Sequence, residues 1–387
     1  MLSLVGDQLA GVAIAVLVFD STGSPLLTAF TYALTFLPPL IGGPLLSGLA
    51  DLLPRRRVMV TSDLVRAALV GLMVLPHLPL WALGGLVFLT VLFGSPFGAA
   101  RAAVMPEVLP GDKYVAGSAI TNITHQFGSV AGFLVGGAVV ALIGTAAALA
   151  IDAMTFVLSA LLLLAGVKAR PSPRREGPAR PSLWGVTKDG ARIVFGDPRM
   201  RQLVLFAWLC GFYVIPEGLA APYAQSLGGG AITVGVLMAA MPIGAAVGAV
   251  LFSRLVRPTD RLRMLSGMAM MSSAPLIGCA LQPSLWVTVT LWVVAGMGSA
   301  YQLAANAAFV VTVPAAARGL AFGLAQSGLQ AAQGLGIMVG GAAAQVFRPE
   351  QVVALAGLAG LAAAAALAVR WARVRTDVIA AMRAAQS

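Results

Sequence analysis

Charged side chains are scarce in this chain, and so are cysteine and histidine. Of 387 residues only 10% are charged, 59% are hydrophobic, and there are two cysteines and two histidines. A soluble fold of this length could not bury so much apolar surface, which excludes an ordinary soluble protein. Cys210 and Cys279 both lie in apolar runs, without the pairing or spacing of a disulfide framework or a metal site. No phosphate-binding Walker loop is present either, which argues against a pump driven by its own ATP hydrolysis.

Long apolar runs take the place of the missing charge. The mean hydropathy is +0.91, and stretches of about 20 apolar residues, enough to cross a bilayer as a helix, recur along the whole chain. The sequence therefore predicts an all-α integral membrane protein with twelve transmembrane helices in two pseudo-symmetric six-helix bundles. The predicted spans are residues 2–20, 26–50, 58–76, 81–105, 115–139, 145–167, 202–226, 231–253, 262–281, 285–313, 318–345 and 350–371.

The basic residues indicate the orientation of these spans. The net charge is +11, and with both termini in the cytoplasm almost every basic loop residue falls on the cytoplasmic side. The opposite loops carry only Arg348. This distribution follows the positive-inside rule and predicts a multi-pass protein of the bacterial inner membrane. The positive charge is then a signal of orientation and of attraction to anionic lipid, and we expect no nucleic-acid partner.

One long hydrophilic segment divides the chain. Residues 168–201 begin with the basic, proline-rich stretch KARPSPRREGPARP, which predicts a linker, and continue as a short amphipathic helix expected at the inner membrane surface. We predict an amino-terminal bundle over 1–167, this linker, a carboxy-terminal bundle over 202–372 and a cytoplasmic tail over 373–387. The first span is short at its start, so it either begins late or continues upstream of the given sequence.

Part of the chain repeats at a constant offset of 204 residues. Residues 94–138 align with 298–342, and the aligned pairs include Gly94 with Gly298, Gln126 with Gln330 and Gly132 with Gly336. Duplicated helical bundles are typical of secondary transporters, which bind substrate where the repeats meet.

Two motifs indicate a family. The segment SGLADLLPRRRVMVTSDLVRA (47–67) resembles the loop between helices two and three of the major facilitator superfamily, with Ser47, Leu52 and Pro54 departing from its pattern. GSVAGFLVGG (128–137) resembles the helix-five antiporter motif of that superfamily, with Phe133 at its proline. The stretches 6–25 and 151–163 are similar to the macrolide-efflux and enterobactin-exporter branch of the drug:proton antiporters. The resemblance covers nearly the whole chain and implies a transporter that works by alternating access, with efflux as its direction.

Charged residues near the inner membrane face form a candidate gate that ties helices two, three and four together. Embedded charge needs a partner, so we expect a network rather than isolated side chains; the alternative is that these residues only anchor the topology. The candidate gate residues are Asp51, Arg55, Arg56, Asp63, Arg66 and Arg101.

Two stripes run along the predicted helices five and eleven. Small residues let helices approach closely, either for plain packing or to seal one bundle against the other; they are Gly128, Gly132, Gly136, Gly137, Gly336 and Gly340. Polar side chains are disfavoured in lipid, so we expect a second set to line a wet substrate cavity, with hydrogen bonding inside a dry bundle as the alternative. This set, with its additions from helix ten, is Asn122, Gln126, Ser129, Tyr301, Gln302, Asn306, Gln326, Gln330 and Gln333. His125 beside it is a packing residue or a proton relay.

Three acids lie within spans, where ionisable groups are functional candidates. In the family that the chain resembles, helices one and seven line the cavity, so we predict Asp7 and Glu217 as proton-coupling residues, and a structural role for Asp152 on the more peripheral helix six. A buried carboxyl can bind a proton and release it when it is rewetted.

These patterns predict a proton-coupled exporter of a small amphipathic molecule. We expect a monomer in the lipid bilayer whose partners are its substrate and protons, with no cofactor, no metal and no enzymatic activity. The first alternative is a dedicated exporter of one siderophore or antibiotic. A second is a non-transporting membrane receptor or enzyme, against which the repeat and the polar stripe argue.

Overall fold

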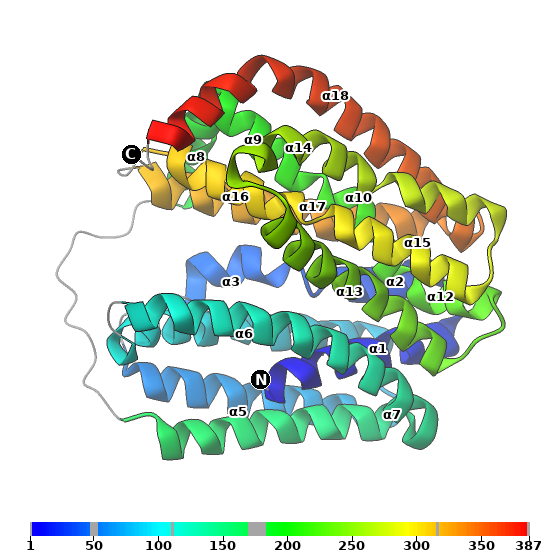
Figure 1. The fold of residues 1–387 in the computed structure, drawn as a ribbon. Coiled ribbons are helices and arrows are strands. Elements are labelled where there is room, and N and C mark those ends of the chain that lie inside the picture. Colours follow the sequence, from blue (N-terminus) through cyan, green and yellow to red (C-terminus); the bar gives the residue numbers. More distant parts are fainter. Residues whose placement is uncertain (1, 47–52, 110–111, 169–182, 315–316, 385–387) are drawn as a thin grey trace. The chain divides into compact units, whose positions relative to one another are not determined.

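The structure is a computed structural model of residues 1–387 and describes all of them except 1, 47–52, 110–111, 169–182, 315–316 and 385–387 (Figure 1). Every element in the described part is helical. The amino-terminal elements are α1 (Leu2–Thr22), α2 (Pro25–Ala33), α3 (Pro38–Leu46), α5 (Arg55–Met73), α6 (Leu80–Val108), α7 (Asp112–Gly166) and α8 (Leu183–Gly196). They are followed by α9 (Pro198–Trp208), α10 (Cys210–Tyr213), α11 (Ile215–Gly218), α12 (Ala220–Ser226), α13 (Ala231–Leu255), α14 (Pro258–Met271), η1 (Ala274–Leu281), α15 (Leu285–Gly298), α16 (Tyr301–Thr312), α17 (Arg318–Ala343) and α18 (Pro349–Ala384).

The predicted all-helical membrane fold is confirmed. Eight helices of the described residues are long and apolar enough to cross a membrane, and a bent pair over Pro198–Gly218 and Ala220–Ser226 makes up to nine. One of these candidates, Ile123–Gly166, covers two predicted spans. The two remaining predicted spans correspond to α5 and α17, which are helical but richer in charged or polar residues. The helices are therefore consistent with the twelve predicted spans.

Glycine separates the fifth and sixth predicted spans. Within α7, Gly144 has φ of 86° and ψ of 169°, so the helix is interrupted there. Only glycine adopts such a positive φ without steric cost, because it has no Cβ. The interruption at this residue divides α7 into two helical halves, which correspond to the fifth and sixth predicted spans.

The chain forms two compact units. The first unit comprises residues 1–179 together with 220–239, and the second comprises 180–219 together with 240–387. Most of each predicted bundle falls within one unit, and the exception is the segment 220–239. The boundary at 168–201 that the sequence suggests therefore stays a prediction.

In the first unit α1 lies against α7, and α5 packs against both α6 and α7. The apolar residues Val12, Ala13 and Val18 of α1 are fully buried there. This packing brings polar residues of α1, α5 and α7 to one place. Burial of apolar surface alone would not fix that arrangement, because lipid is as apolar as the core.

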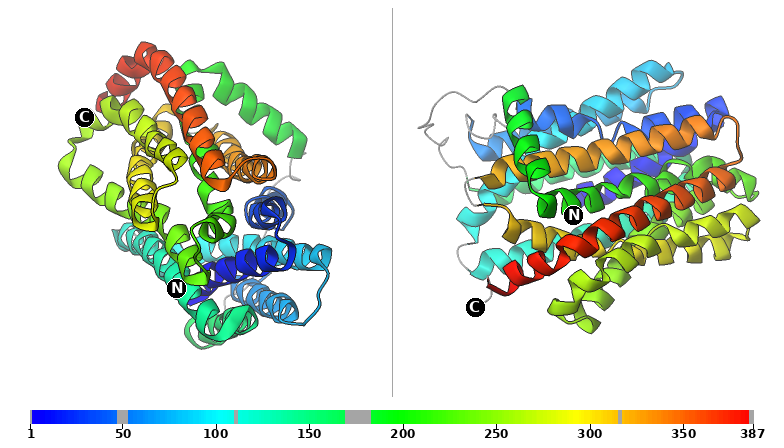
Figure 2. Two further views of the ribbon diagram at one scale, coloured as in Figure 1. Left: turned by 90° about the vertical axis from the view of Figure 1, so that its right-hand side faces the viewer. Right: turned by 90° about the horizontal axis from the view of Figure 1, so that it is seen from above.

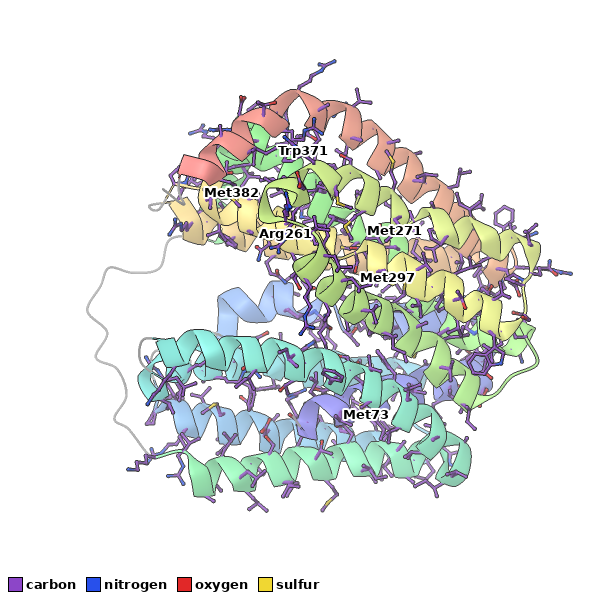
Figure 3. All side chains as sticks on the ribbon, in the orientation of Figure 1. Met73, Arg261, Met271, Met297, Trp371 and Met382 are labelled. Atoms are coloured by element: carbon purple, nitrogen blue, oxygen red, sulfur yellow. The ribbon has the colours of Figure 1, made fainter. Side chains whose placement is uncertain are left out.

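In the second unit α18 packs along η1 and α14, which follow one another in the chain (Figure 2). Its Trp371 is 1% exposed and donates from Nε1 to the carbonyl oxygen of Leu262 at 3.2 Å (Figure 3). The ring of Phe206 on α9 packs edge-on against Trp371 and against Tyr301. This aromatic cluster fixes α9, α16 and α18 relative to one another.

The predicted amphipathic helix of the linker forms as α8. It packs against α17 of the second unit, where Val194 is fully buried. A Cβ on Gly190 would lie 2.8 Å from the Leu320 carbonyl oxygen, so the two helices approach closely at this glycine. The predicted contact of α8 with the membrane surface stays a prediction.

Candidate transport site

The most concentrated charge inside the first unit surrounds Arg66 of α5. Its Nη2 donates to Oδ1 of Asp7 on α1 at 2.7 Å, and its Nη1 lies 4.0 Å from Oδ1 of Asp63. The Asp7 side chain is 36% exposed, whereas that of Asp63 is fully buried. Asp63 and Arg66 therefore meet the acid of the first span, which the sequence had assigned to proton coupling and not to the gate.

Three side chains of α7 also lie near Arg66 or Asp7. The Arg66 guanidinium lies 4.0 Å from the centroid of the Phe156 ring, a cation–π contact. Asp152 is 1% exposed, accepts from the Thr155 hydroxyl at 3.3 Å and interacts electrostatically with Asp7 and Arg66. His125 interacts electrostatically with Asp7. We call Asp7, Asp63, Arg66 and Asp152 the acid–arginine cluster.

The arginines at the start of α5 bind the ends of two neighbouring helices. Arg55 Nη1 donates to the Ala103 carbonyl oxygen at 3.1 Å, and Arg56 Nη2 donates to the Leu164 carbonyl oxygen. Leu164 is among the last four residues of α7, whose carbonyls lack helical partners, and Ala103 lies in the second-last turn of α6. The helix dipole favours a cation near such carboxyl ends. Both arginines therefore hold α6 and α7 to the start of α5.

For the other two candidate gate residues, Asp51 and Arg101, the described part of the structure gives no contact with the gate. Asp51 lies outside the described residues, and Arg101 on α6 is exposed. The proposed network between helices two, three and four thus stays a prediction. What the described residues do place together is the acid–arginine cluster and, separately, the pair Arg55 and Arg56.

The seventh predicted span is broken in the second unit. Short helices α10 and α11 follow α9, and Pro216 supplies no backbone N–H for a helical hydrogen bond. Glu217 lies in this broken stretch, half-buried, and interacts electrostatically with Tyr213. Discontinuous helices at mid-membrane form binding sites in many transporters.

Residues of α16 bind the backbone at this break. The buried Tyr301 hydroxyl donates to the Phe206 carbonyl oxygen at 2.8 Å. Gln302 Nε2 donates to the Ala207 carbonyl oxygen and to the Tyr213 hydroxyl, both at 3.0 Å. Both side chains thereby satisfy carbonyls of the interrupted helix, which is the hydrogen-bonding alternative to cavity lining.

The remaining polar candidates differ in exposure. Ser129 is 5% exposed and accepts from Gln8 Nε2 of α1 at 3.2 Å. Gln126, Gln330 and Gln333 are half-buried, while Asn306 and Gln326 are exposed. The side chain of Asn122 lies outside the described set. A cavity-lining role for these residues stays a prediction.

The glycine stripe of α7 lies against α1. A Cβ on Gly132 would come 2.8 Å from the Val5 carbonyl oxygen, and one on Gly136 would come 2.9 Å from the Leu9 Cα. Gly128 likewise faces the side chain of Leu4.

The repeat copy of this stripe lies on α17 and behaves in the same way. A Cβ on Gly336 would collide with the Gly211 carbonyl oxygen of α10, and one on Gly340 with the side chain of Ile215 on α11. Gly137, on another side of α7, meets α13, since its Cβ would lie 2.8 Å from the Ala231 carbonyl oxygen. The fifth span on the first and the eleventh on the seventh are thus equivalent contacts, in agreement with the offset of 204 residues in the sequence.

Sequence reasoning missed Gln8, and it separated Asp152 from Asp7. A side chain on Gly6 would collide with the Asp152 carboxylate, so α1 and α7 touch there. No local pattern announces this contact, because the two residues are 146 positions apart. The adjacent polar residues Asp7 and Gln8, which precede a run of eleven apolar residues in α1, were the available signal.

Among the residues that the structure describes, no group of three or more His, Cys, Asp or Glu is arranged to hold a metal ion. The first unit holds three carboxyls around one arginine, and the second unit holds hydrogen-bonding amides and phenols beside a broken helix. Together with the duplicated helical units, these features define a polytopic secondary transporter. The chain belongs to the Major Facilitator Superfamily, whose family model matches residues 1–265 and 218–383. This is a family of membrane transporters and not of enzymes, and the protein is accordingly a multi-span membrane transporter.

Exporters are among the proteins whose sequences are similar to this chain. The chain is 28% identical to the enterobactin exporter EntS of Escherichia coli O1:K1 over 305 residues, which cover 76% of this chain and 68% of that protein. It is 25% identical to the uncharacterized MFS-type transporter YvqJ of Bacillus subtilis strain 168 over 238 residues, covering 59% of this chain and 56% of YvqJ.

Solved structures share the fold. The nucleoside transporter NupG superposes with a TM-score of 0.73 at 16% identity, covering 96% of this chain and 97% of that one. A bacterial homologue of the iron transporter ferroportin, in an inward-facing state, gives 0.71 at 15% identity, with 97% and 96% covered. At these identities the likeness shows the fold alone.

Proposed function

We propose that this protein exports a small amphipathic molecule across the bacterial inner membrane in exchange for protons, with both termini in the cytoplasm. The similarity to enterobactin exporters over about three quarters of the chain supports the outward direction. The protein acts as a monomer, and its partners are the substrate, protons and the surrounding lipid.

The observation that carries the coupling proposal is the ion pair between Asp7 and Arg66 at 2.7 Å inside the first unit. Charge in a membrane interior is costly, and a paired acid and base there are retained for a role. When a proton neutralises Asp7, the pair loses its attraction and α1 can shift against α5. Outward movement of substrate is then linked to proton entry.

Glu217 is the second proposed coupling residue. It occupies the broken seventh span, which has short helical pieces instead of a continuous ladder of hydrogen bonds. A carboxyl in such a stretch can change its surroundings with a small backbone movement. Its proton would be exchanged as the break opens and closes.

Flux through purified protein in liposomes tests the proposal. With a pH difference imposed across the membrane, the wild type should accumulate substrate, whereas Asp7→Asn and Glu217→Gln should permit only downhill exchange. Asp20→Asn is the matched control, because Asp20 is an exposed acid at the other end of α1. Full pH-driven accumulation by either test variant assigns that residue a structural role.

The substrate is sought with a susceptibility panel of drugs and metabolites in a host that lacks its own pumps. A broad pattern of protection supports export of many amphipathic molecules. The second candidate is a dedicated siderophore exporter, which the named enterobactin exporters favour. For that candidate only siderophore secretion should change between hosts with and without the gene.

A further inference from the structure

Arg66 lies between two carboxyls that differ in their exposure, in the helix that carries them and in their distance from the guanidinium. Asp7 on α1 is bonded to it at 2.7 Å and is partly exposed, while Asp63 on its own helix is 4.0 Å away and fully buried. The guanidinium that joins one acid is thus only about 1 Å short of charge-assisted hydrogen-bond distance to the other.

The carboxylate of Asp63 has little to stabilise its charge. Both oxygens are buried and neither accepts a hydrogen bond of good geometry from the described residues, so that the Ser159 hydroxyl of α7, which acts on this carboxyl, is at most a weak partner. A buried anion with one weak hydrogen-bond partner is strongly unfavourable. This carboxyl therefore needs either a proton or the guanidinium of Arg66.

The charges around Asp63 do not balance unless some of the neighbouring carboxyls are protonated. The acid–arginine cluster holds three carboxyls and one guanidinium, and Asp152 has no basic partner within 4.0 Å in the described part of the chain. Other titratable groups also act on the cluster: His125 of α7, through His125 the Arg101 of α6, and on Asp63 the amino-terminus of the chain. Three ionised carboxyls around one cation would be too costly in an apolar interior.

We infer that Arg66 is a two-position switch between Asp7 and Asp63, which adds Asp63 to the proton-exchanging residues of the first unit. In the arrangement seen here Arg66 pairs with the Asp7 carboxylate, and Asp63 keeps its proton. When a proton from water binds Asp7, Arg66 turns to Asp63, and Asp63 releases its proton to water that reaches it as α1 moves away. One proton is taken up at the exposed acid and one is given up at the buried acid, so the number of bound protons is unchanged and only O–H bonds are made and broken.

The surroundings allow this movement. The Phe156 ring lies under the guanidinium at 4.0 Å. A cation–π contact extends to about 6 Å from the ring centroid, so a short turn of Arg66 need not break it. The inference rests on the proposed proton coupling for its role in transport, but the switch itself is a property of the protein without substrate.

Infrared difference spectroscopy of the purified full chain, without substrate, tests the switch directly. At neutral pH the wild type should show a protonated-carboxyl band from Asp63, which Asp63→Asn removes. Because the switch takes up one proton and gives up another, a change of pH alone does not drive it; Asp7→Asn drives it, since it fixes the neutral form at position 7. In Asp7→Asn the Asp63 band should be lost, because Arg66 then pairs with an ionised Asp63, and adding Asp63→Asn to that variant should change nothing further in this region. Asp260→Asn, in an exposed pair with Arg263, should leave the Asp63 band unchanged. A wild type without the Asp63 band, or an Asp7→Asn protein that keeps it, overturns the inference.

Flux experiments separate this inference from the proposed function. Asp63→Asn should lower pH-driven accumulation at least tenfold and leave downhill exchange intact, and Asp63→Glu should restore part of the accumulation. If the wild type shows no pH-driven flux, the proposed function fails while the infrared result still decides the switch. If the wild type is pH-driven and Asp63→Asn equals it, the switch is wrong. Should Asp63→Asn not fold, Arg66→Lys replaces it: lysine lacks the forked geometry, so wild-type coupling in that variant overturns the inference.

Discussion

A side chain on Gly132 would collide with the backbone of Val5, because its Cβ would lie 2.8 Å from the Val5 carbonyl oxygen. The fifth and first spans therefore touch backbone to backbone. The same relation recurs 204 residues later, where Gly336 of α17 lies against the carbonyl of Gly211 in the broken seventh span. Two spans per unit are thus held at a distance that only glycine permits.

The first prediction concerns this contact. Gly336→Ala should lower the melting temperature in detergent and reduce transport. The added methyl group would meet the backbone of Gly211, which cannot turn aside as a side chain could, so α17 would have to move away from α10. Gly323→Ala on the same helix is the matched control, since a Cβ there meets nothing within 4 Å. It should be neutral or stabilising by up to about 1 kcal/mol, because alanine favours a helix. Equal melting temperatures for the two variants would show that the contact does not limit stability.

The sequence predicts features that depend on residues near one another in the chain better than features that depend on residues far apart. The apolar runs predict the helices, because membrane burial needs about 20 apolar residues in a row, and the offset repeat predicts equivalent glycine stripes. The interruption after Trp208 was not predicted, because Pro216 alone does not place breaks on both sides of it. The sequence predicted a continuous span over 202–226 instead.

The site was predicted in its parts and not in its assembly. Asp7 was singled out as an acid within a span, whereas Asp63 and Arg66 were singled out as charges near the inner membrane face and grouped with the cytoplasmic gate. Their joining to Asp7 depends on α1 packing against α5 and α7, a tertiary contact with no local signature. The role of Tyr301 in satisfying a broken helix was hidden for the same reason, because the break itself was not visible in the sequence.

The second prediction tests that role. Tyr301→Phe should destabilise the protein by roughly 1 kcal/mol, because the Phe206 carbonyl loses a buried hydrogen bond while the ring is kept. Thermal unfolding in detergent measures the loss. The control is Thr290→Val, which removes an exposed hydroxyl that bonds within its own helix and should change little. A melting temperature equal to that of the wild type would mean that other donors already satisfy the break.

The third prediction separates three consecutive arginines. Arg55→Ala and Arg56→Ala should each reduce transport several-fold, since each frees a carbonyl near the end of α6 or α7 and loosens that helix from α5. Arg57→Ala should resemble the wild type, because Arg57 is exposed. The measurement is substrate efflux at matched membrane levels. A defect of the same size in all three variants would indicate that total positive charge matters and not the two hydrogen bonds.

The last prediction is a dependence of stability on pH at the start of the seventh span. Asp197 caps α9: its Oδ1 accepts from the Arg199 backbone N–H at 2.7 Å, and its Oδ2 accepts from Arg199 Nη2 at 2.8 Å. The Arg199 side-chain hydrogen bond, aided by backbone N–H groups, holds the pKa of Asp197 below its ordinary value. A carboxyl with a lowered pKa stabilises the fold above its unfolded pKa of about 3.9, and the stabilisation fades as the pH falls through the lower folded value.

Asp197→Ala should therefore cost about 1 kcal/mol at neutral pH, mostly through the lost cap. The half-exposed Arg199 adds little to that cost, because solvent screens the ion pair. The difference in melting temperature from the wild type should stay constant down to about pH 4 and narrow below it. Asp189→Ala, at an exposed position of α8, is the control and should show no such dependence. A difference that widens towards acid pH would contradict the assignment, because the folded pKa of Asp197 would then have to lie above the unfolded one.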